Sequence, residues 1–114
     1  TLRRSSAASD VYKRQVSGQI GSKPGTREVV EGGIGTETIQ TLNNIKMILN
    51  KLGSNTDKIF KCLCMLEDID DYAEMNNAYT TFFDSRDSLP SRSTFAGSGL
   101  ALGAKIEIEC WATK

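Results

Sequence analysis

The stretch TETIQTLNNIKMILNKLG, residues 36–53, decides the fold class because it predicts a long amphipathic helix. Its apolar side chains recur at three- and four-residue steps, at Ile39, Leu42, Ile45, Leu49 and Leu52. This spacing places them on one helix face, which must pack against another layer. Thr36 is the predicted N-cap, Glu37 lies in the positively polarised first turn, and Gly53 is the predicted C-terminal cap.

Strand patterns lie on both sides of this helix. VSGQI (16–20) is typical of a strand that ends in a turn, and DKIFKCLCMLED (57–68) is apolar and of strand length. SRSTFAG (91–97) places Arg92 and Thr94 on one strand face. AKIEIECWAT (104–113) alternates, so that Glu107 and Glu109 share the face opposite Ile106, Ile108 and Cys110.

A second helix is predicted from IDDYAEMNNAYTTFFDS, residues 69–85. Its buried side carries Tyr72, Met75, Tyr79 and either Phe82 or Phe83. The resulting order is strand, helix, strand, helix, strand, strand, without a repeat or a linker. This order predicts one α+β domain in which both helices pack on one face of the sheet.

The segment before Val16 has no apolar period. SSAASDVYKRQ (5–15) back-translates, with one choice of codons, into a string resembling the adaptor that transposase-based sequencing libraries attach to DNA. We therefore expect residues 1–15 to be a non-native, adaptor-derived and disordered segment, and exclude them from fold reasoning. Residues 16–114 are then a single domain that lacks its first strand.

The charge balance argues against nucleic acid as the partner. The chain has 14 basic and 14 acidic residues. Setting aside the four basic residues and one acid of segment 1–15 leaves 10 against 13, a net charge of −3. This excess of acid, without a basic stripe, disfavours a phosphate-binding surface. No apolar run is long enough to cross a membrane.

Two further patterns invite functional interpretations that we do not favour. Cys62, Cys64 and Cys110 lack a histidine with which to complete a metal site, so we expect buried, reduced thiols. GGIGTE (32–37) and GSGLALG (97–103) are glycine-rich, but neither carries a complete phosphate-binding motif. We interpret both as turns.

Taken together, the segments VSGQI, VVEGGIGTETIQTLNNIKMIL, MLEDIDDYAEMNNAYTTFF, PSRSTF and KIEIECWA resemble the reactive intermediate deaminase A family, also called YjgF/YER057c/UK114. The resemblance covers residues 16–114. It implies a chorismate-mutase-like α+β fold, a homotrimer with pockets in the clefts between subunits, and a cytoplasmic location, with a mitochondrial location as the alternative. One family feature, a pocket tyrosine in a Gly-Pro-Tyr motif, would lie upstream of Val16.

The resemblance also implies an activity: hydrolysis of 2-enamine and 2-imine acids to 2-oxo acids and ammonia, as by a 2-iminobutanoate/2-iminopropanoate deaminase. No cofactor and no metal is implied. By position, Arg92 is the residue that grips the substrate carboxylate and Glu107 the one that activates water. Ser17, Gly18, Asn76 and Thr94 are the implied substrate-binding residues.

Two alternatives to this function remain open. One is a non-catalytic trimer that binds small carboxylates or shields other proteins as a chaperone does. The other is an RNA-cleaving inhibitor of translation, which the net charge of −3 and the absence of histidine disfavour. The presence of Arg92 favours catalysis, because many relatives lack this arginine.

Overall fold

The structure, a computed structural model, describes residues 13–84 and 89–113. Its helices and strands, in chain order, are β1 (Lys13–Ile20), α2 (Ile34–Lys51), β2 (Ile59–Leu66), α3 (Tyr72–Phe82), β3 (Ser91–Ala96) and β4 (Ile106–Thr113). Short 3-10 helices at Thr56–Lys58, Ile69–Asp71 and Ala101–Gly103 connect them. The predicted α+β order is confirmed.

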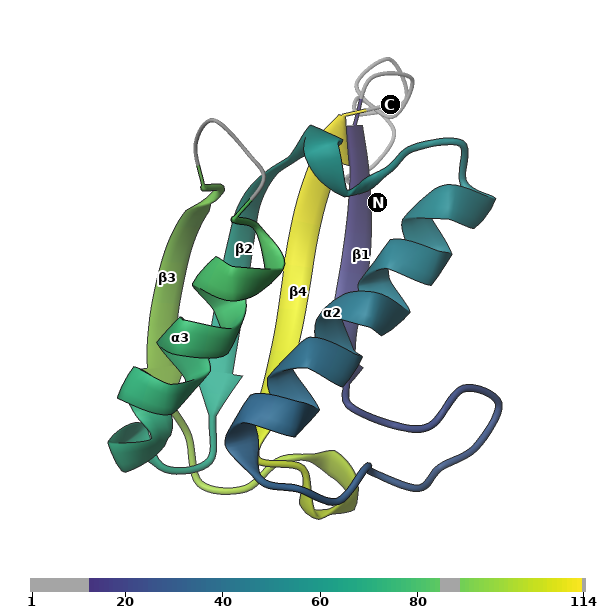
Figure 1. The fold of residues 1–114 in the computed structure, drawn as a ribbon. Helices are drawn as coiled ribbons and strands as arrows, with labels where there is room; N and C mark the ends of the chain where they lie inside the picture. Colours follow the sequence, from purple (N-terminus) through teal and green to yellow (C-terminus); the bar gives the residue numbers. More distant parts are fainter. Residues whose placement is uncertain (1–12, 85–88, 114) are drawn as a thin grey trace.

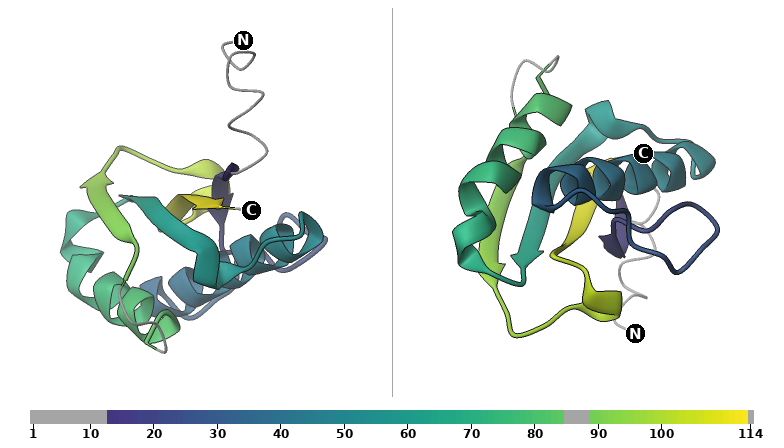
Figure 2. Two further views of the ribbon diagram at one scale, coloured as in Figure 1. Left: turned by 90° about the horizontal axis from the view of Figure 1, so that it is seen from above. Right: turned by 60° about the horizontal axis from the view of Figure 1, so that its bottom comes forward.

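The four strands form one mixed sheet in the order β1-β4-β2-β3. β4 is antiparallel to both β1 and β2, whereas β2 and β3 run parallel. Figure 1 shows α2 and α3 side by side on the same face of this sheet, with α3 over the β2–β3 side and α2 over the β4–β1 side. The prediction of two helices on one sheet face is therefore confirmed, and in the views of Figure 2 neither α2 nor α3 lies on the opposite face.

The core lies between the sheet and the two helices. On β4, Ile106, Ile108 and Cys110 are fully buried, while Glu107 and Glu109 are half-buried on the other face. The alternation predicted for this strand is confirmed. The helices contribute Leu42, Ile45 and Leu49 from α2, and Met75, Tyr79 and Phe83 from α3 and its end.

Helix α2 begins two residues before the predicted N-cap, so the assignment of that role to Thr36 is wrong. The N-cap is Gly33, whose φ of 88° is a conformation that glycine adopts readily, and Gly32 also has a positive φ. The predicted end is correct: Gly53 has a φ of 80° directly after the last turn. Within the described ranges, neither helix is long and apolar enough to cross a membrane.

Two polar residues of α2 hold the strands that carry candidate site residues. The Asn44 amide donates to the backbone carbonyls of Ile20 and Ser22 at 3.1 and 2.9 Å, at the end of β1. The buried Glu37 carboxylate accepts a 2.8 Å hydrogen bond from the backbone N–H of Lys105, just before β4. Each bond satisfies polar groups beneath the helix and fixes one strand end.

Strand β1 includes part of the segment that we expected to be disordered. Lys13, Arg14 and Gln15 pair with Thr113, Ala112 and Trp111 of β4. The expectation of disorder is therefore wrong for these three residues, because the edge of β4 offers backbone groups that an extended segment pairs with regardless of its side chains. Residues 1–12, the rest of that segment, lie outside the described residues.

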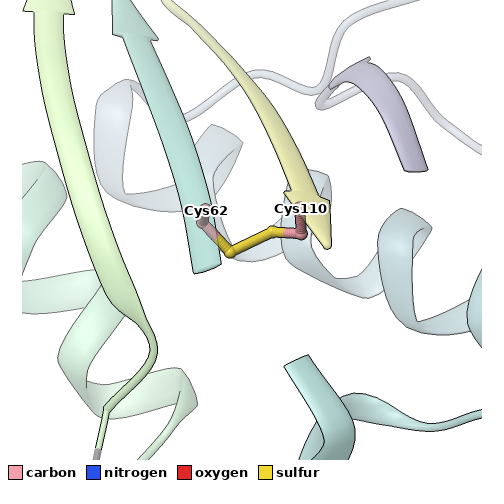
Figure 3. Close-up of a disulfide and its surroundings, with 2 residues drawn as sticks. All are labelled: Cys62 and Cys110. Carbon is pink, nitrogen blue, oxygen red and sulfur yellow. A yellow bond between two sulfur atoms is a disulfide. The ribbon is translucent and has the colours of Figure 1, made fainter. Parts of the chain in front are cut away.

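The expectation of three reduced thiols is wrong. Cys62 and Cys110 form a disulfide between β2 and β4, shown in Figure 3. The two residues are direct partners in the antiparallel register, with Cα atoms 4.1 Å apart. Cys64 is the remaining free thiol and is buried on the same face. Because the pairing depends on strand register, the spacing in the sequence did not reveal it.

Candidate functional site

Arg92 lies beneath helix α3, in contact with two tyrosine rings. Its Nη2 donates a 2.7 Å hydrogen bond to the hydroxyl of Tyr72. Its guanidinium carbon is 5.4 Å from the centre of the Tyr72 ring and 4.7 Å from that of Tyr79. At these distances a cation is attracted to the face of an aromatic ring. The two tyrosines therefore hold the guanidinium at the edge of the sheet.

Among the residues that the structure describes, no carboxylate forms an ion pair with Arg92. Its side chain is half-buried. A partly desolvated guanidinium with only neutral partners retains several N–H donors and an uncompensated charge. Such a group is suited to binding an anion.

Thr94 shares the strand of Arg92, and Asn76 lies on the same helix as the two tyrosines that contact Arg92. Thr94 follows Arg92 by two residues on the same strand face, and its buried Oγ1 has no hydrogen-bond partner among the residues described. Asn76 is one turn from Tyr72 on α3 and three residues before Tyr79, so the three share a helix stripe. The structure thus brings Arg92, Thr94 and Asn76 to the same side of the molecule.

Cys64 pairs with Thr94 in the parallel register of β2 and β3. Burial raises the pKa of the Cys64 thiol to about 12, and the nearby Arg92 cation opposes this effect only in part. The thiol therefore stays protonated at neutral pH and is a poor nucleophile.

Ser17, Gly18 and Glu107 form a second group on β1 and β4. The register between these strands shifts between Val16 and Gln19, so Ser17 and Gly18 occupy a bulge. A Cβ atom at Gly18 would overlap with Oε2 of Glu107 and lie 2.9 Å from its Cδ. Glycine at this position therefore allows the Glu107 carboxylate to approach the backbone of β1 closely.

These two groups lie on opposite faces of the sheet. Arg92 pairs with Cys62 and Thr94 with Cys64, and paired residues point to the same face, which here is the helix face. Glu107 points away from the helices, as does Met65, with which it pairs. The structure of one chain therefore does not bring the predicted carboxylate receptor and the predicted base together.

Two tyrosines in contact with Arg92 were not among the predicted site residues. The sequence pattern placed Tyr72 and Tyr79 on the buried side of α3, and Tyr79 is indeed 1% exposed. Tyr72 is 40% exposed, so its predicted burial is wrong. As the first residue of α3, it lies at the sheet edge, and among the described residues no strand beyond β3 covers it there. The sequence did carry a signal for the two tyrosines, because residues 72, 76 and 79 lie on one helix stripe and residue 76 was a predicted site residue.

One cavity between the helices contains none of the predicted site residues. It is a groove of about 630 Å³ between α2 and α3, lined by residues that include Gly35, Gln40, Glu74, Asn77 and Thr81. Within the described ranges, no group of three or more histidine, cysteine, aspartate or glutamate side chains is arranged to hold a metal ion. The expectation of a site that works without metal or cofactor stays a prediction.

The fold agrees with the match to a known family. A sequence model described as endoribonuclease L-PSP matches residues 11–114, and the chain belongs to this family, which includes the reactive intermediate deaminases. The predicted family membership is confirmed.

Relatives within the family carry a more specific description. The 2-iminobutanoate/2-iminopropanoate deaminase of Rattus norvegicus is 36% identical over 99 residues, which are 87% of this chain and 71% of the rat protein. Among solved structures, the YjgF gene product of E. coli is 32% identical with a TM-score of 0.84, over 90% of this chain and 81% of that one.

A third similar protein was solved with a ligand. E. coli TdcF with bound serine is 30% identical, with a TM-score of 0.83, over 90% of this chain and 81% of that chain. Serine is a small amino acid with a carboxylate.

Proposed function

We propose that this protein hydrolyses 2-imino acids, and their 2-enamino tautomers, to 2-oxo acids and ammonia. The observation that carries the proposal is the half-buried Arg92, which contacts two tyrosines and, among the described residues, no carboxylate. A 2-imino acid supplies the missing anion. The names of deaminase relatives at about 35% identity support this choice of reaction.

Arg92 binds the substrate carboxylate through two parallel N–H donors, a geometry that an ammonium group does not offer. Thr94 Oγ1 and the Asn76 amide provide further polar contacts on the same side. A ligand on Arg92 gives the buried Thr94 hydroxyl a partner, which otherwise is missing within the described residues.

Glu107 activates the attacking water. It removes a proton from a water molecule as the water oxygen bonds to the imine carbon, and the C=N electron pair moves to nitrogen. The proton is returned to that nitrogen, which gives a 2-amino-2-hydroxy acid. Glu107 then carries the proton of the new hydroxyl to the amino group, the C–N bond breaks with its electron pair going to nitrogen, ammonia leaves, and the carbon–oxygen double bond of the 2-oxo acid forms. The backbone of Gly18 and the hydroxyl of Ser17 orient the water or substrate beside Glu107.

Because Arg92 and Glu107 lie on opposite faces of the sheet, a complete site requires two copies of the chain. One copy contributes Arg92, Thr94 and Asn76, and its neighbour contributes Glu107, Gly18 and Ser17. The uncovered sheet face carries Glu107 and exposed apolar side chains such as Phe95, 49% exposed, and burial of this face in an assembly stabilises it. We propose a homotrimer with one site in each cleft, located in the cytoplasm.

A specific observation favours a second function, the binding of small carboxylates without catalysis. A similar protein, TdcF, was solved with bound serine. A coupled assay distinguishes the two functions: a pyridoxal-phosphate-dependent dehydratase generates 2-iminobutanoate from threonine, and the imine signal is followed with and without the protein. Faster imine decay supports hydrolysis. Unchanged decay together with binding of 2-oxobutanoate supports the binding function.

Gly18 offers a test of the position of Glu107. In Gly18→Ala the new Cβ displaces the Glu107 carboxylate. We expect kcat to fall by about 10- to 100-fold, because a misplaced base loses much of its contribution. Gly97→Ala is the matched control, since nothing lies within 4 Å of a Cβ there. Steady-state imine hydrolysis by both variants gives the answer; equal activity in the two would show that the bulge does not position Glu107.

A further inference from the structure

Tyr72 differs from the other groups around Arg92 because it is both polar at its tip and accessible. Its side chain is 40% exposed, and its hydroxyl lies 2.7 Å from Arg92 Nη2. Tyr79, the other ring against the guanidinium, is 1% exposed. Of these two tyrosines, Tyr72 is the one that a ligand approaching Arg92 from solvent meets.

The direction of the hydrogen bond leaves a donor at this position. A guanidinium has only donors, so the Tyr72 oxygen accepts. In this hydrogen bond the Tyr72 hydroxyl uses its oxygen, and its O–H proton takes no part. A hydroxyl that accepts from a cation is polarised and becomes a stronger donor. An anion bound by Arg92 is therefore within reach of a further, neutral donor beside the charge.

We infer that Tyr72 is a substrate-binding residue that works with Arg92: it holds the guanidinium and donates its own O–H to the substrate carboxylate. This inference rests on the proposed function, since it takes the carboxylate of a small 2-imino or 2-oxo acid as the ligand. A carboxylate has about four lone-pair positions, so it accepts two N–H groups of Arg92 and one hydroxyl together.

The residue is expected to act on binding more than on chemistry. The carboxylate of the substrate keeps its charge throughout the reaction, so a bond to it is equally strong before and in the transition state. Loss of such a uniform interaction raises KM and leaves kcat nearly unchanged.

The test uses Tyr72→Phe, which keeps the ring near Arg92 and removes only the oxygen. We expect KM for 2-iminobutanoate to rise roughly 10- to 100-fold with kcat within about twofold, as for loss of a hydrogen bond to a charged group. Titration calorimetry with 2-oxobutanoate, the reaction product, should show a weakening of the same size. Thr81→Val, which removes an exposed hydroxyl elsewhere on α3, is the control and should match the parent protein.

The outcomes separate this inference from the proposed function. If the parent protein hydrolyses the imine and Tyr72→Phe has an unchanged or lower KM, the role of Tyr72 is refuted and the function stands. If the parent protein does not speed imine decay but binds 2-oxobutanoate in a way that depends on the Tyr72 hydroxyl, the role of Tyr72 stands and the catalytic function is refuted. If the parent protein neither hydrolyses the imine nor binds 2-oxobutanoate, the role of Tyr72 and the proposed function are both refuted.

Discussion

Replacement of Arg92 by alanine is expected to lower kcat/KM for 2-iminobutanoate by roughly two to three and a half decades, the equivalent of about 3–5 kcal/mol. The reason is that the substrate carboxylate, partly desolvated beneath α3, would lose its charged partner. The two tyrosines also contact this guanidinium. Its removal therefore takes away the donor of the hydrogen bond that the Tyr72 hydroxyl accepts. Steady-state imine hydrolysis measures the effect.

Arg92→Lys is the informative companion variant. An ammonium keeps the charge but does not reproduce two parallel donors or the planar contact with the rings of Tyr72 and Tyr79. We expect it to recover less than about one decade of the loss. Near-full activity in Arg92→Ala would remove Arg92 from the mechanism, and full recovery by lysine would show that charge alone is sufficient.

The second large effect is expected at Glu107. Glu107→Gln keeps the size of the side chain and removes the base, so kcat should fall by about 100- to 10,000-fold while KM changes much less. In the proposed site the Glu107 side chain does not contact the substrate carboxylate that Arg92 binds. We therefore expect Glu107→Gln to change mainly kcat, whereas Arg92→Ala weakens substrate binding. Single-turnover kinetics on the assembled protein separates the chemical step from binding.

Glu109→Gln is the matched control for Glu107→Gln. Glu109 lies two residues further along β4 on the same sheet face, and its Oε2 is 3.5 Å from the Gln15 amide, a long and weak contact. It belongs to neither group of the proposed site. We expect its loss to leave kcat within about threefold of the parent value. Equal losses of kcat in Glu107→Gln and Glu109→Gln would mean that activity depends on the carboxylates of this sheet face in general and not on Glu107 as the base.

The sequence predicted the elements well because their hydrophobic periods are strong. The alternation of Ile106, Ile108 and Cys110 with two glutamates admits one orientation of β4 when one face is covered by helices. The stripe of α2 likewise decided which helix face is buried. The start of α2 was missed because the positive φ values of Gly32 and Gly33 outweighed the capping preference of Thr36.

The parts that were missed depend on how strands pair. The disulfide needs Cys62 and Cys110 to be directly opposite, and no local pattern sets the register of two strands that are far apart in the sequence. The same holds for Arg92 and Glu107. Alternation placed each on a face of its own strand, but only the pairing of Arg92 with the buried Cys62 shows that the two lie on opposite faces of the sheet.

The central claim is that one site takes Arg92 and Glu107 from different copies of the chain. It is tested most directly by mixing two variants, Arg92→Ala and Glu107→Gln, that are each nearly inactive. In a cyclic assembly formed at random from equal amounts, about a quarter of the sites combine the intact Arg92 of one variant with the intact Glu107 of the other. We therefore predict that co-assembly restores about a quarter of the parent activity. Activity that stays at the level of the separate variants after verified subunit mixing would contradict the claim.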